Sequence, residues 1–225
     1  MKNQLNELQK SINYIFKDAN LLKLALTHRS VGLANNERLE FLGDSILNFA
    51  VGSALYNKFP EVKEGDLSRM RSSLVKEATL AMIATRFDLG RYMLLGFGEK
   101  KNNGRNRVSI LADAVEAIIG AIYLDSSETK VYSIVNEWFS DLLAEVTPGE
   151  KQKDSKTRLQ EYLQSKKMNL PIYNILDIKG KDHNQVFYAS CMIEELSITK
   201  EGSGSTRRIA EQNAAYLTLK EINII

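Results

Sequence analysis

Two long apolar stretches of the chain each contain only two charged residues, and all four of those residues are acids. The stretches are residues 39–56, with Glu40 and Asp44, and residues 109–124, with Asp113 and Glu116. Spacings of i,i+4 and i,i+3 place the two acids of each stretch on one face of a helix. A carboxylate in apolar surroundings is costly unless something neutralises it, and neither stretch contains a Lys or Arg. The pattern predicts two helices whose acids converge on an external cation.

The donor set indicates which cation these acids would bind. Carboxylates without His or Cys suit a hard ion such as Mg²⁺, or Mn²⁺ in its place. The chain has one cysteine, Cys191, which we interpret as a core residue, and two histidines, His28 and His183. Neither a disulfide nor a structural zinc site is therefore expected, and the Glu-x-x-His pairs of di-iron bundles are missing. One acid pair alone would indicate a solvated helix stripe, but two pairs favour a magnesium site of the kind used in phosphate chemistry.

Composition sets broad limits on location and partners. The 225 residues are 44% hydrophobic, which is enough for a core, but no apolar run is long enough to span a membrane. The N-terminus, MKNQLNELQKSINYIF, lacks the apolar stretch of a secretory signal, so a cytoplasmic location is expected. The formal net charge is only +2, so nucleic-acid binding must depend on locally placed basic residues.

The first part of the chain is predicted to be an all-α domain covering residues 1–146. Asp18 is expected to cap a helix that runs to Ser30, while Pro60 and Gly90 are expected to end later helices. A segment rich in Gly, Asn, Lys and Arg, residues 96–107, is expected to be an exposed loop. The remaining predicted helices are residues 35–59, 66–75, 76–87, 109–124 and 129–146.

A change of pattern marks a second domain. Residues 147–155, TPGEKQKDS, combine Pro, Gly and charges without apolar periodicity, and we interpret them as a linker. Residues 156–225 are predicted to form a helix, three strands and a last helix. The predicted elements are helix 156–167, strands 172–179, 186–193 and 196–200, and a helix from Ser205. This α-β-β-β-α order is typical of a small α+β domain with its helices on one face of a sheet.

Three blocks of the first domain resemble the ribonuclease III family. They are NERLEFLGD at 36–44, FPEVKEGDLSRMRSSLV at 59–75 and SILADAVEAIIGAIYLD at 109–125. They follow the family's order and spacing, and the resemblance, to the bacterial type with one catalytic domain, extends over nearly the whole chain. It implies an endoribonuclease that hydrolyses double-stranded RNA with Mg²⁺ to 5′-phosphate and 3′-hydroxyl ends with short 3′ overhangs. Processing of ribosomal, messenger and transfer RNA is the expected role.

The same resemblance implies roles for individual residues. Four acids correspond to the family's ligands for catalytic Mg²⁺, which also position the attacking water: Glu40, Asp44, Asp113 and Glu116. Glu37 and Glu64 correspond to two further acids of the cleft, and because all six are present, a degenerate, non-catalytic homologue is not indicated. Phe41 corresponds to an aromatic residue at the interface of a homodimer, in which each subunit supplies one site for one strand. From the residues alone, Phe41 would be assigned to the core of one chain.

Two helices of the second domain carry polar residues suited to duplex RNA. One face of the helix at 156–167 presents Thr157, Gln160 and Gln164, which are able to bond 2′-hydroxyls in a minor groove, but the residues alone favour an ordinary polar helix face. Arg207 and Arg208 fall in the first turn of the last helix. Cations at that end oppose the helix dipole, so an external phosphate there is favoured over a solvated pair.

The runs TRLQEYLQ, at 157–164, and GSGSTRRIAEQNAA, at 202–215, resemble the double-stranded-RNA-binding domain. The resemblance implies that the first helix and the loop between the first two strands contact successive minor grooves. It places His183 in that loop, and it places Ser205, Arg207 and Arg208 at the end of the last helix, which spans the intervening phosphates. The family often has Lys-Lys where this chain has Arg-Arg, which preserves charge but changes contact geometry.

Three classes of function compete for these features. The first is a double-strand-specific endoribonuclease, and the second is a protein that binds duplex RNA without cutting it. The third is a helical metalloenzyme unrelated to RNA. The complete acid set favours the enzyme over the binding protein, and the second domain argues against the third class.

Overall fold

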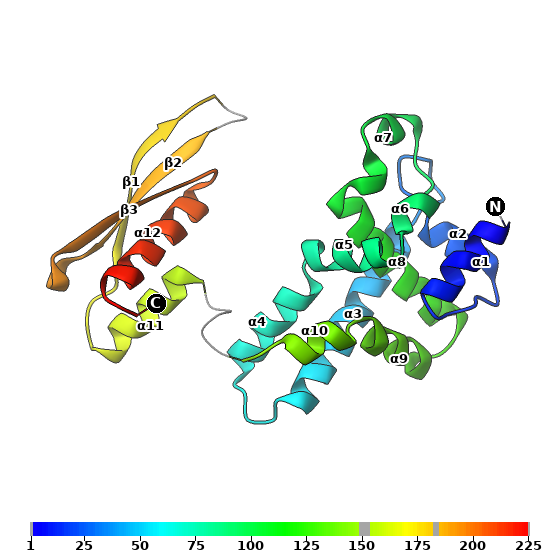
Figure 1. Ribbon diagram of the computed structural model, residues 1–225, viewed down its shortest axis with the longest axis horizontal. Coiled ribbons are helices and arrows are strands. Elements are labelled where there is room, and N and C mark those ends of the chain that lie inside the picture. Colours follow the sequence, from blue (N-terminus) through cyan, green and yellow to red (C-terminus); the bar gives the residue numbers. More distant parts are fainter. Residues whose placement is uncertain (1, 149–153, 182–184, 225) are drawn as a thin grey trace. The chain divides into compact units, whose positions relative to one another are not determined.

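The computed structural model describes residues 2–148, 154–181 and 185–224, and the chain divides into two compact units. These units are Met1–Pro148 and Gly149–Ile225, so the division falls within the segment 147–155 that the sequence suggests as a linker. Figure 1 shows the elements of each unit, which are described separately below.

The N-terminal unit is built from helices, apart from one isolated bridge between Thr27 and Leu94. Its elements are α1 (Lys2–Ser11), α2 (Ala19–Ala25), α3 (Glu37–Lys58), α4 (Glu64–Val75), α5 (Glu77–Arg86), α6 (Leu89–Tyr92), α7 (Phe97–Lys101), the 3-10 turn η1 (Gly104–Asn106), α8 (Val108–Asp125), α9 (Glu128–Trp138) and α10 (Ser140–Glu145). Helix α8 lies at the centre and packs against α2, α3 and α5. Within the described residues, no helix is both long and apolar enough to cross a membrane.

In the middle of α8, the two acids are only half-buried, whereas the residues around them are fully buried. Between Ile110 and Ile122, each residue except Asp113 and Glu116 is buried. The apolar positions therefore cover all sides of the helix, which is typical of a helix enclosed by others. Between Ile110 and Ile122, the two acids are therefore the positions at which α8 reaches the surface.

Helices α3 and α8 touch through their backbones. A Cβ atom on Gly43 would lie 1.8 Å from the carbonyl oxygen of Glu116, and one on Gly120 would lie 2.3 Å from that of Leu39. Only glycine permits this approach, because a side chain at either position would overlap the facing backbone. The contact brings the acid-bearing faces of the two helices together.

The predicted start of α2 is confirmed, but its predicted end is wrong. The Asp18 side chain caps the helix by accepting a hydrogen bond from the Asn20 backbone N–H at 2.9 Å. The helix ends at Ala25 instead of continuing to residue 30. Beyond it, the backbone of Leu26 accepts from Leu94 at 2.8 Å, and the chain pairs with that distant segment.

The segment 96–107, predicted as a loop, contains the short elements α7 and η1. Arg107 and Glu99 form an ion pair at 3.0 Å, and Arg105 donates to the Gly90 carbonyl at 2.7 Å. Gly90 lies within α6 and does not end α5. Its role is close packing, since a Cβ there would be 2.3 Å from the Arg105 carbonyl oxygen. These contacts join residues far apart in the sequence, so local composition could not indicate them.

The single helix predicted at 129–146 is two helices, α9 and α10, with a break at the buried Phe139. Arg86 donates from its guanidinium to the Trp138 carbonyl at 2.7 Å. This bond provides an outside partner for a carbonyl at the end of α9, where the helix leaves such groups unpaired.

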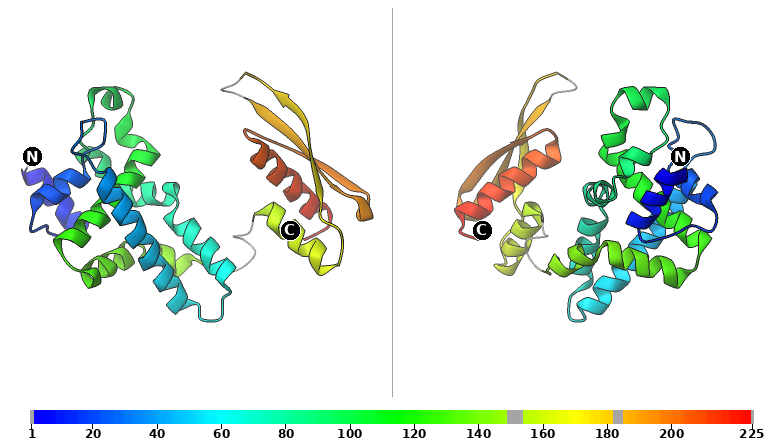
Figure 2. Two further views of the ribbon diagram at one scale, coloured as in Figure 1. Left: turned by 180° about the vertical axis from the view of Figure 1, so that it is seen from behind. Right: turned by 45° about the vertical axis from the view of Figure 1, so that its right-hand side comes forward.

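The C-terminal unit has the predicted α-β-β-β-α order. Its elements are α11 (Ser155–Ser165), β1 (Ile172–Lys179), β2 (Val186–Ile193), the 3-10 turn η3 (Glu194–Leu196), β3 (Ile198–Gly204) and α12 (Arg207–Glu221). The sheet is antiparallel in the order β1-β2-β3, and both helices lie on one of its faces (Figure 2). The core between helices and sheet is formed by Leu159, Leu163, Cys191, Ile193, Ala214, Ala215 and Leu219.

Strand β3 begins and ends later than predicted. Residues Glu194–Leu196 form the 3-10 turn, and Ser197 adopts a left-handed φ of 52°, so the strand starts only at Ile198. Near its end, a Cβ on Gly202 would lie 2.2 Å from the Ala214 backbone nitrogen. Helix α12 thus rests directly on β3, as the small residues Ala210, Ala214 and Ala215 suggest.

Candidate active site

The contact between α3 and α8 brings three of the four predicted metal ligands together. Glu40 on α3 and both Asp113 and Glu116 on α8 each offer a carboxylate oxygen, and these oxygens lie within 4.8 Å of one another. All three side chains are half-buried. We call these three residues the acid cluster. Three oxygen donors at this separation, without His or Cys, fit a hard divalent cation.

The fourth predicted ligand, Asp44, lies outside the acid cluster as defined by that separation. Asp44 is one turn after Glu40 on α3 and is exposed. Its carboxylate accepts a hydrogen bond from the Asn48 side-chain amide at 2.8 Å, and the same amide donates to the Asp44 carbonyl at 3.0 Å. This local bond holds the carboxylate toward the next turn of α3, although its charge still acts on Glu116.

The surroundings of the acid cluster disfavour the ionised form of its three carboxyl groups. Burial, followed by the charges of Asp44, Glu40, Asp113 and Glu77, raises the pKa of Glu116 to about 8. Burial is also the main cause that raises the pKa of Glu40 and that of Asp113, with neighbouring carboxylates adding to it. Desolvation and like charges both penalise an ionised carboxylate. A cation bound here would remove both penalties.

Glu77 belongs to the surroundings of this site, although the sequence did not suggest it. It is the first residue of α5, and its charge raises the pKa of both Asp113 and Glu116. In the sequence, Glu77 follows Lys76 at an ordinary polar helix start. No local pattern distinguishes it, because only the packing of α5 against α8 brings it near the acids.

The two accessory acids of the prediction lie near the ends of helices. Glu37, the first residue of α3, pairs with Arg29 at 3.4 Å, and both side chains are exposed. Glu64, the first residue of α4, lines a separate cavity of about 370 Å³ together with Tyr56 and Arg71. Neither belongs to the acid cluster, although the charge of Glu37 raises the pKa of Glu40.

The C-terminal unit exposes the side chains that the sequence suggested for RNA. On α11, Gln160 and Gln164 are exposed and Thr157 is half-buried, so the three form an accessible stripe. Ser205 is exposed just before α12, whose N-cap is Thr206, accepting from the Ile209 backbone at 3.2 Å. The predicted loop residue, His183, lies outside the described residues.

The two arginines of α12 differ in their surroundings. Arg207 donates from Nε to Glu211 at 2.8 Å, which gives this cation an intramolecular partner that the dipole argument did not include. Arg208 is exposed and forms no ion pair with a residue that the structure describes. The ion pair reduces the conflict with the helix dipole for Arg207, whereas Arg208 has only the more distant charge of Asp154, whose pKa it helps to lower.

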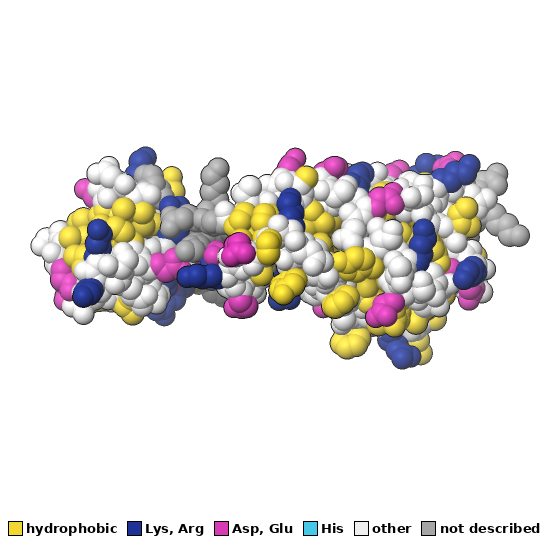
Figure 3. Space-filling model, turned by 90° about the horizontal axis from the view of Figure 1, so that it is seen from below, with side chains coloured by type: hydrophobic (Ala, Val, Ile, Leu, Met, Phe, Trp, Pro, Cys, Tyr) yellow, Lys and Arg dark blue, Asp and Glu magenta, His cyan; other side chains and the backbone are white. Residues whose placement is uncertain are grey.

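Phe41 does not belong to the core of its own chain. Its exposed fraction is 78%, so the core assignment that the residues alone favoured is wrong. Other apolar side chains of α3, including Phe49 at 66% and Tyr56 at 71%, are also exposed. Figure 3 shows exposed apolar side chains gathered in patches on the side of the N-terminal unit that it displays. Large exposed apolar residues on one helix favour an interface.

Comparison with known proteins matches both units. Residues 18–143 match the Ribonuclease-III-like family, and residues 155–222 match the double-stranded RNA binding motif. A protein named Ribonuclease 3 from Actinobacillus pleuropneumoniae serotype 5b (strain L20) is 58% identical over 219 residues, which cover 97% of this chain and 98% of that protein.

Solved structures agree with this match in the N-terminal unit. A crystal structure of the nuclease domain of ribonuclease III from Campylobacter jejuni is 44% identical, with a TM-score of 0.62, and covers 65% of this chain and 100% of that one. A second structure of that domain, described as flexible in a region involved in dimer formation, is 46% identical, with a TM-score of 0.59, and covers 60% and 95%. The chain therefore belongs to the ribonuclease III family, the endoribonucleases specific for double-stranded RNA.

Proposed function

We propose that this protein hydrolyses both strands of duplex RNA with Mg²⁺ held at the acid cluster, leaving 5′-phosphate and 3′-hydroxyl ends with short 3′ overhangs. The observation that carries the proposal is the convergence of Glu40, Asp113 and Glu116 within 4.8 Å. When bound, Mg²⁺ lowers the pKa of a coordinated water and stabilises negative charge on phosphate oxygens. The cleavage step is thereby assigned to the N-terminal unit.

We assign a separate role at this site to each group of acidic residues. Glu40, Asp113 and Glu116 would hold the cation, and Asp44, one turn after Glu40, is proposed to complete the ligand set and to help position the attacking water. Glu37 and Glu64, which lie outside the acid cluster, are proposed as accessory acids that assist with RNA or metal. Because the pKa of Glu116 is raised to about 8, this carboxyl holds a proton near neutral pH, and it would have to release that proton to serve as a cation ligand.

A direct test incubates a long RNA duplex with the protein, with and without Mg²⁺, and compares it with a single strand of the same sequence. Mg²⁺-dependent fragments from the duplex, with 5′-phosphate ends, support the proposal. A protein that retains the duplex in a binding assay but yields no fragments with Mg²⁺ or Mn²⁺ would instead be a binding protein that does not cut.

The acid cluster should make stability depend on pH and Mg²⁺ together. The folded-state pKa of Glu116 lies near 8, above its ordinary value, so its contribution to stability is complete below about pH 4.5 and is lost as the pH rises through about 8. We expect Mg²⁺ to raise the melting temperature more at about pH 9 than at about pH 6. Thermal unfolding at both pH values measures this. An equal Mg²⁺ effect at both, or an unchanged pH dependence in Glu116→Gln, would contradict it.

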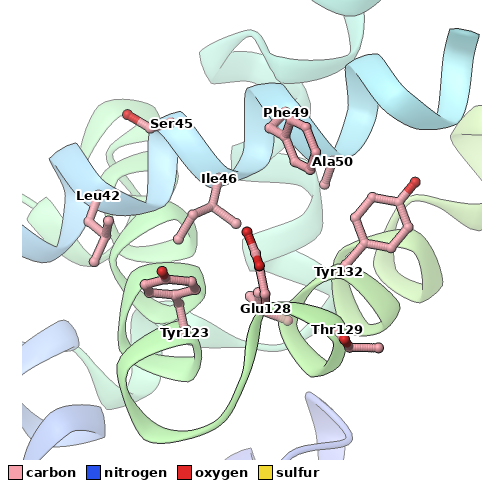
Figure 4. A pocket seen from close by; sticks show the side chains of 10 residues that line it. Leu42, Ser45, Ile46, Phe49, Ala50, Tyr123, Glu128, Thr129 and Tyr132 are labelled. Atoms are coloured by element: carbon pink, nitrogen blue, oxygen red, sulfur yellow. The ribbon is translucent and has the colours of Figure 1, made fainter.

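The nuclease unit is proposed to form a homodimer through the exposed side of α3. Beside Phe41 lies an apolar groove of about 580 Å³. Figure 4 shows that its walls come from α3, with Leu42 and Ile46, and from α8 and α9, with Tyr123 and Tyr132. In a twofold dimer, the same groove on each subunit can receive the partner's aromatic side chain. The region involved in dimer formation in the Campylobacter jejuni nuclease domain supports this assembly.

The dimer proposal predicts a mass in solution of about twice the chain mass of 25.4 kDa, measured by light scattering. Phe41→Ala removes an apolar side chain worth about 2 kcal/mol per buried copy, so dilution should shift this variant toward the monomer. Phe97→Ala is the matched control, because Phe97 is 85% exposed on α7 and away from α3. A wild-type monomer that still cuts both strands at one staggered position would refute the two-site arrangement.

The C-terminal unit is proposed to hold the duplex. The stripe of Thr157, Gln160 and Gln164 contacts one minor groove, and His183 contacts the next. Ser205, Arg207 and Arg208 meet the phosphates between them. This division follows the geometry by which such domains recognise shape instead of sequence. With precursor ribosomal RNA and other transcripts as substrates, we place the enzyme in the cytoplasm.

Replacing Arg207 and Arg208 together by Ala should weaken binding about equally for duplexes of unrelated sequence, because phosphates carry no sequence information. The log–log salt dependence should become shallower by roughly one unit per lost contact. Duplex affinity measured at several salt concentrations checks this, with Lys220→Ala, at the other end of α12, as the control. Parallel curves of equal height for wild type and double variant would show that both arginines are merely solvated.

A further inference from the structure

A buried carboxylate joins the N-terminal ends of the two helices of the C-terminal unit. Glu211, on α12, is only 8% exposed. One of its oxygens accepts from Lys156 Nζ at 2.6 Å, and the other accepts from Arg207 Nε at 2.8 Å. Lys156 belongs to the first turn of α11 and Arg207 to the first turn of α12. Glu211 therefore connects two cations from two different helices.

Two further contacts hold Lys156 in this position. Its backbone N–H donates to the side chain of Gln212 at 3.1 Å, and its ammonium lies 4.2 Å from the centre of the Tyr173 ring on β1. A cation over an aromatic face is attracted by the ring. The start of α11 is thus fixed to α12 and to the sheet by contacts that converge on Lys156.

The ionised state of Glu211 depends on these partners. Burial alone would raise its pKa, but the bonds from Arg207 and Lys156 outweigh burial and hold the pKa of Glu211 below its ordinary value. Removing one partner of such a group leaves a buried charge poorly compensated. The arrangement therefore constrains all three side chains together.

Arg207 is left able to bind a second group. Its Nε is taken by Glu211, yet its side chain is 67% exposed. A guanidinium has five N–H donors in a rigid fork, so the terminal nitrogens remain available for a phosphate. A side chain already held in one orientation loses less entropy when it binds.

We propose that Glu211, itself held by Lys156, is a positioning residue for duplex RNA, which orients Arg207 toward the phosphates. The inference rests on the proposed RNA contacts of α11 and α12. It has a counterintuitive consequence. Removing a negative charge from an RNA-binding surface would tighten binding if only net charge mattered, whereas loss of a positioning residue weakens it.

The experiment measures duplex affinity of the full-length protein without divalent cations, so that no cleavage occurs. Glu211→Gln should weaken binding by about fivefold, a coupling typical of residues in one network. Glu201→Gln is the matched control, since it makes the same charge change at an exposed position on β3 and should leave affinity unchanged or slightly higher. Lys156→Met, which keeps the aliphatic stem, should also weaken binding.

A double-mutant cycle with Arg207→Ala identifies the route of the effect. If Glu211 acts through Arg207, Glu211→Gln should cost less than about twofold in the Arg207→Ala background. Melting curves establish that each variant is folded at the assay temperature. If Glu211→Gln is not, Glu211→Asp, which keeps the charge but withdraws it by one methylene group, enters the same cycle.

The outcomes distinguish a failure of the positioning role from a failure of the proposed RNA contacts on which it rests. Equal or tighter binding by Glu211→Gln, relative to Glu201→Gln, overturns the positioning role. So does an undiminished loss in the Arg207→Ala background. If Arg207→Ala itself leaves affinity and salt dependence unchanged, the proposed phosphate contact fails first, and the positioning role fails with it.

Discussion

Replacing Glu116 by Gln is expected to reduce Mg²⁺-dependent cleavage of duplex RNA by about a thousandfold, which corresponds to roughly 4 kcal/mol in the activation barrier. The substitution keeps the side-chain shape but removes one of the three charges that converge on the proposed cation site. Metal-assisted hydrolysis depends on the charge and number of the ligands, so both cation affinity and catalysis should suffer. Duplex binding should survive, because the proposed RNA contacts lie in the other unit.

The measurement is a single-turnover cleavage rate together with duplex affinity for the same preparation. Glu145→Gln is the control, because it removes an exposed carboxylate on α10 and should cleave normally. The variant should also be folded at least as stably as wild type without Mg²⁺ near pH 9, where the wild-type Glu116 charge is least favourable. A wild-type cleavage rate in Glu116→Gln would remove Glu116 from the catalytic site.

Gly43→Ala is expected to destabilise the nuclease unit by about 3 kcal/mol and to abolish cleavage together with stability. Its added Cβ would lie 1.8 Å from the Glu116 carbonyl oxygen, far inside any allowed contact. The facing group is backbone and cannot rotate away, so α3 and α8 must separate. Because Glu40 and Glu116 lie on these two helices, the separation would also disperse the acid cluster.

The control for this prediction is Gly52→Ala in the same helix. A Cβ there would meet only the Arg71 side chain, at 3.7 Å, which is ordinary contact. Alanine favours helix over glycine by about 1 kcal/mol, so Gly52→Ala should be neutral or stabilising. Chemical denaturation of the two variants measures the difference. If Gly43→Ala proves as stable and as active as Gly52→Ala, the backbone contact between α3 and α8 is not as close as described here.

The helices and the family could be recognised from the sequence because their signals are local. Apolar periodicity marks α3 and α8, and the runs 39–56 and 109–124 contain four acids but no Lys or Arg. The order of elements in the C-terminal unit is also a local signal, because the spacing of apolar residues there changes between a helical and a strand-like pattern. Even the pair of Arg207 and Glu211 has a local signal, since the two lie at i,i+4. The burial of Glu211 and its hydrogen bond to Lys156 have no such local signal in the sequence.

What the sequence determined by itself is thus the set of residues that carry the chemistry: the acids, the arginines and the exposed stripes. Only the tertiary structure decided which of them meet. It placed Glu77 beside the acids and brought Glu40 of α3 together with Asp113 and Glu116 of α8. It also left Phe41 exposed and gave Gly43 a contact with α8. The physical reason is that periodicity specifies which face of an element is apolar, whereas the approach of two elements depends on side chains and backbones far apart in the chain.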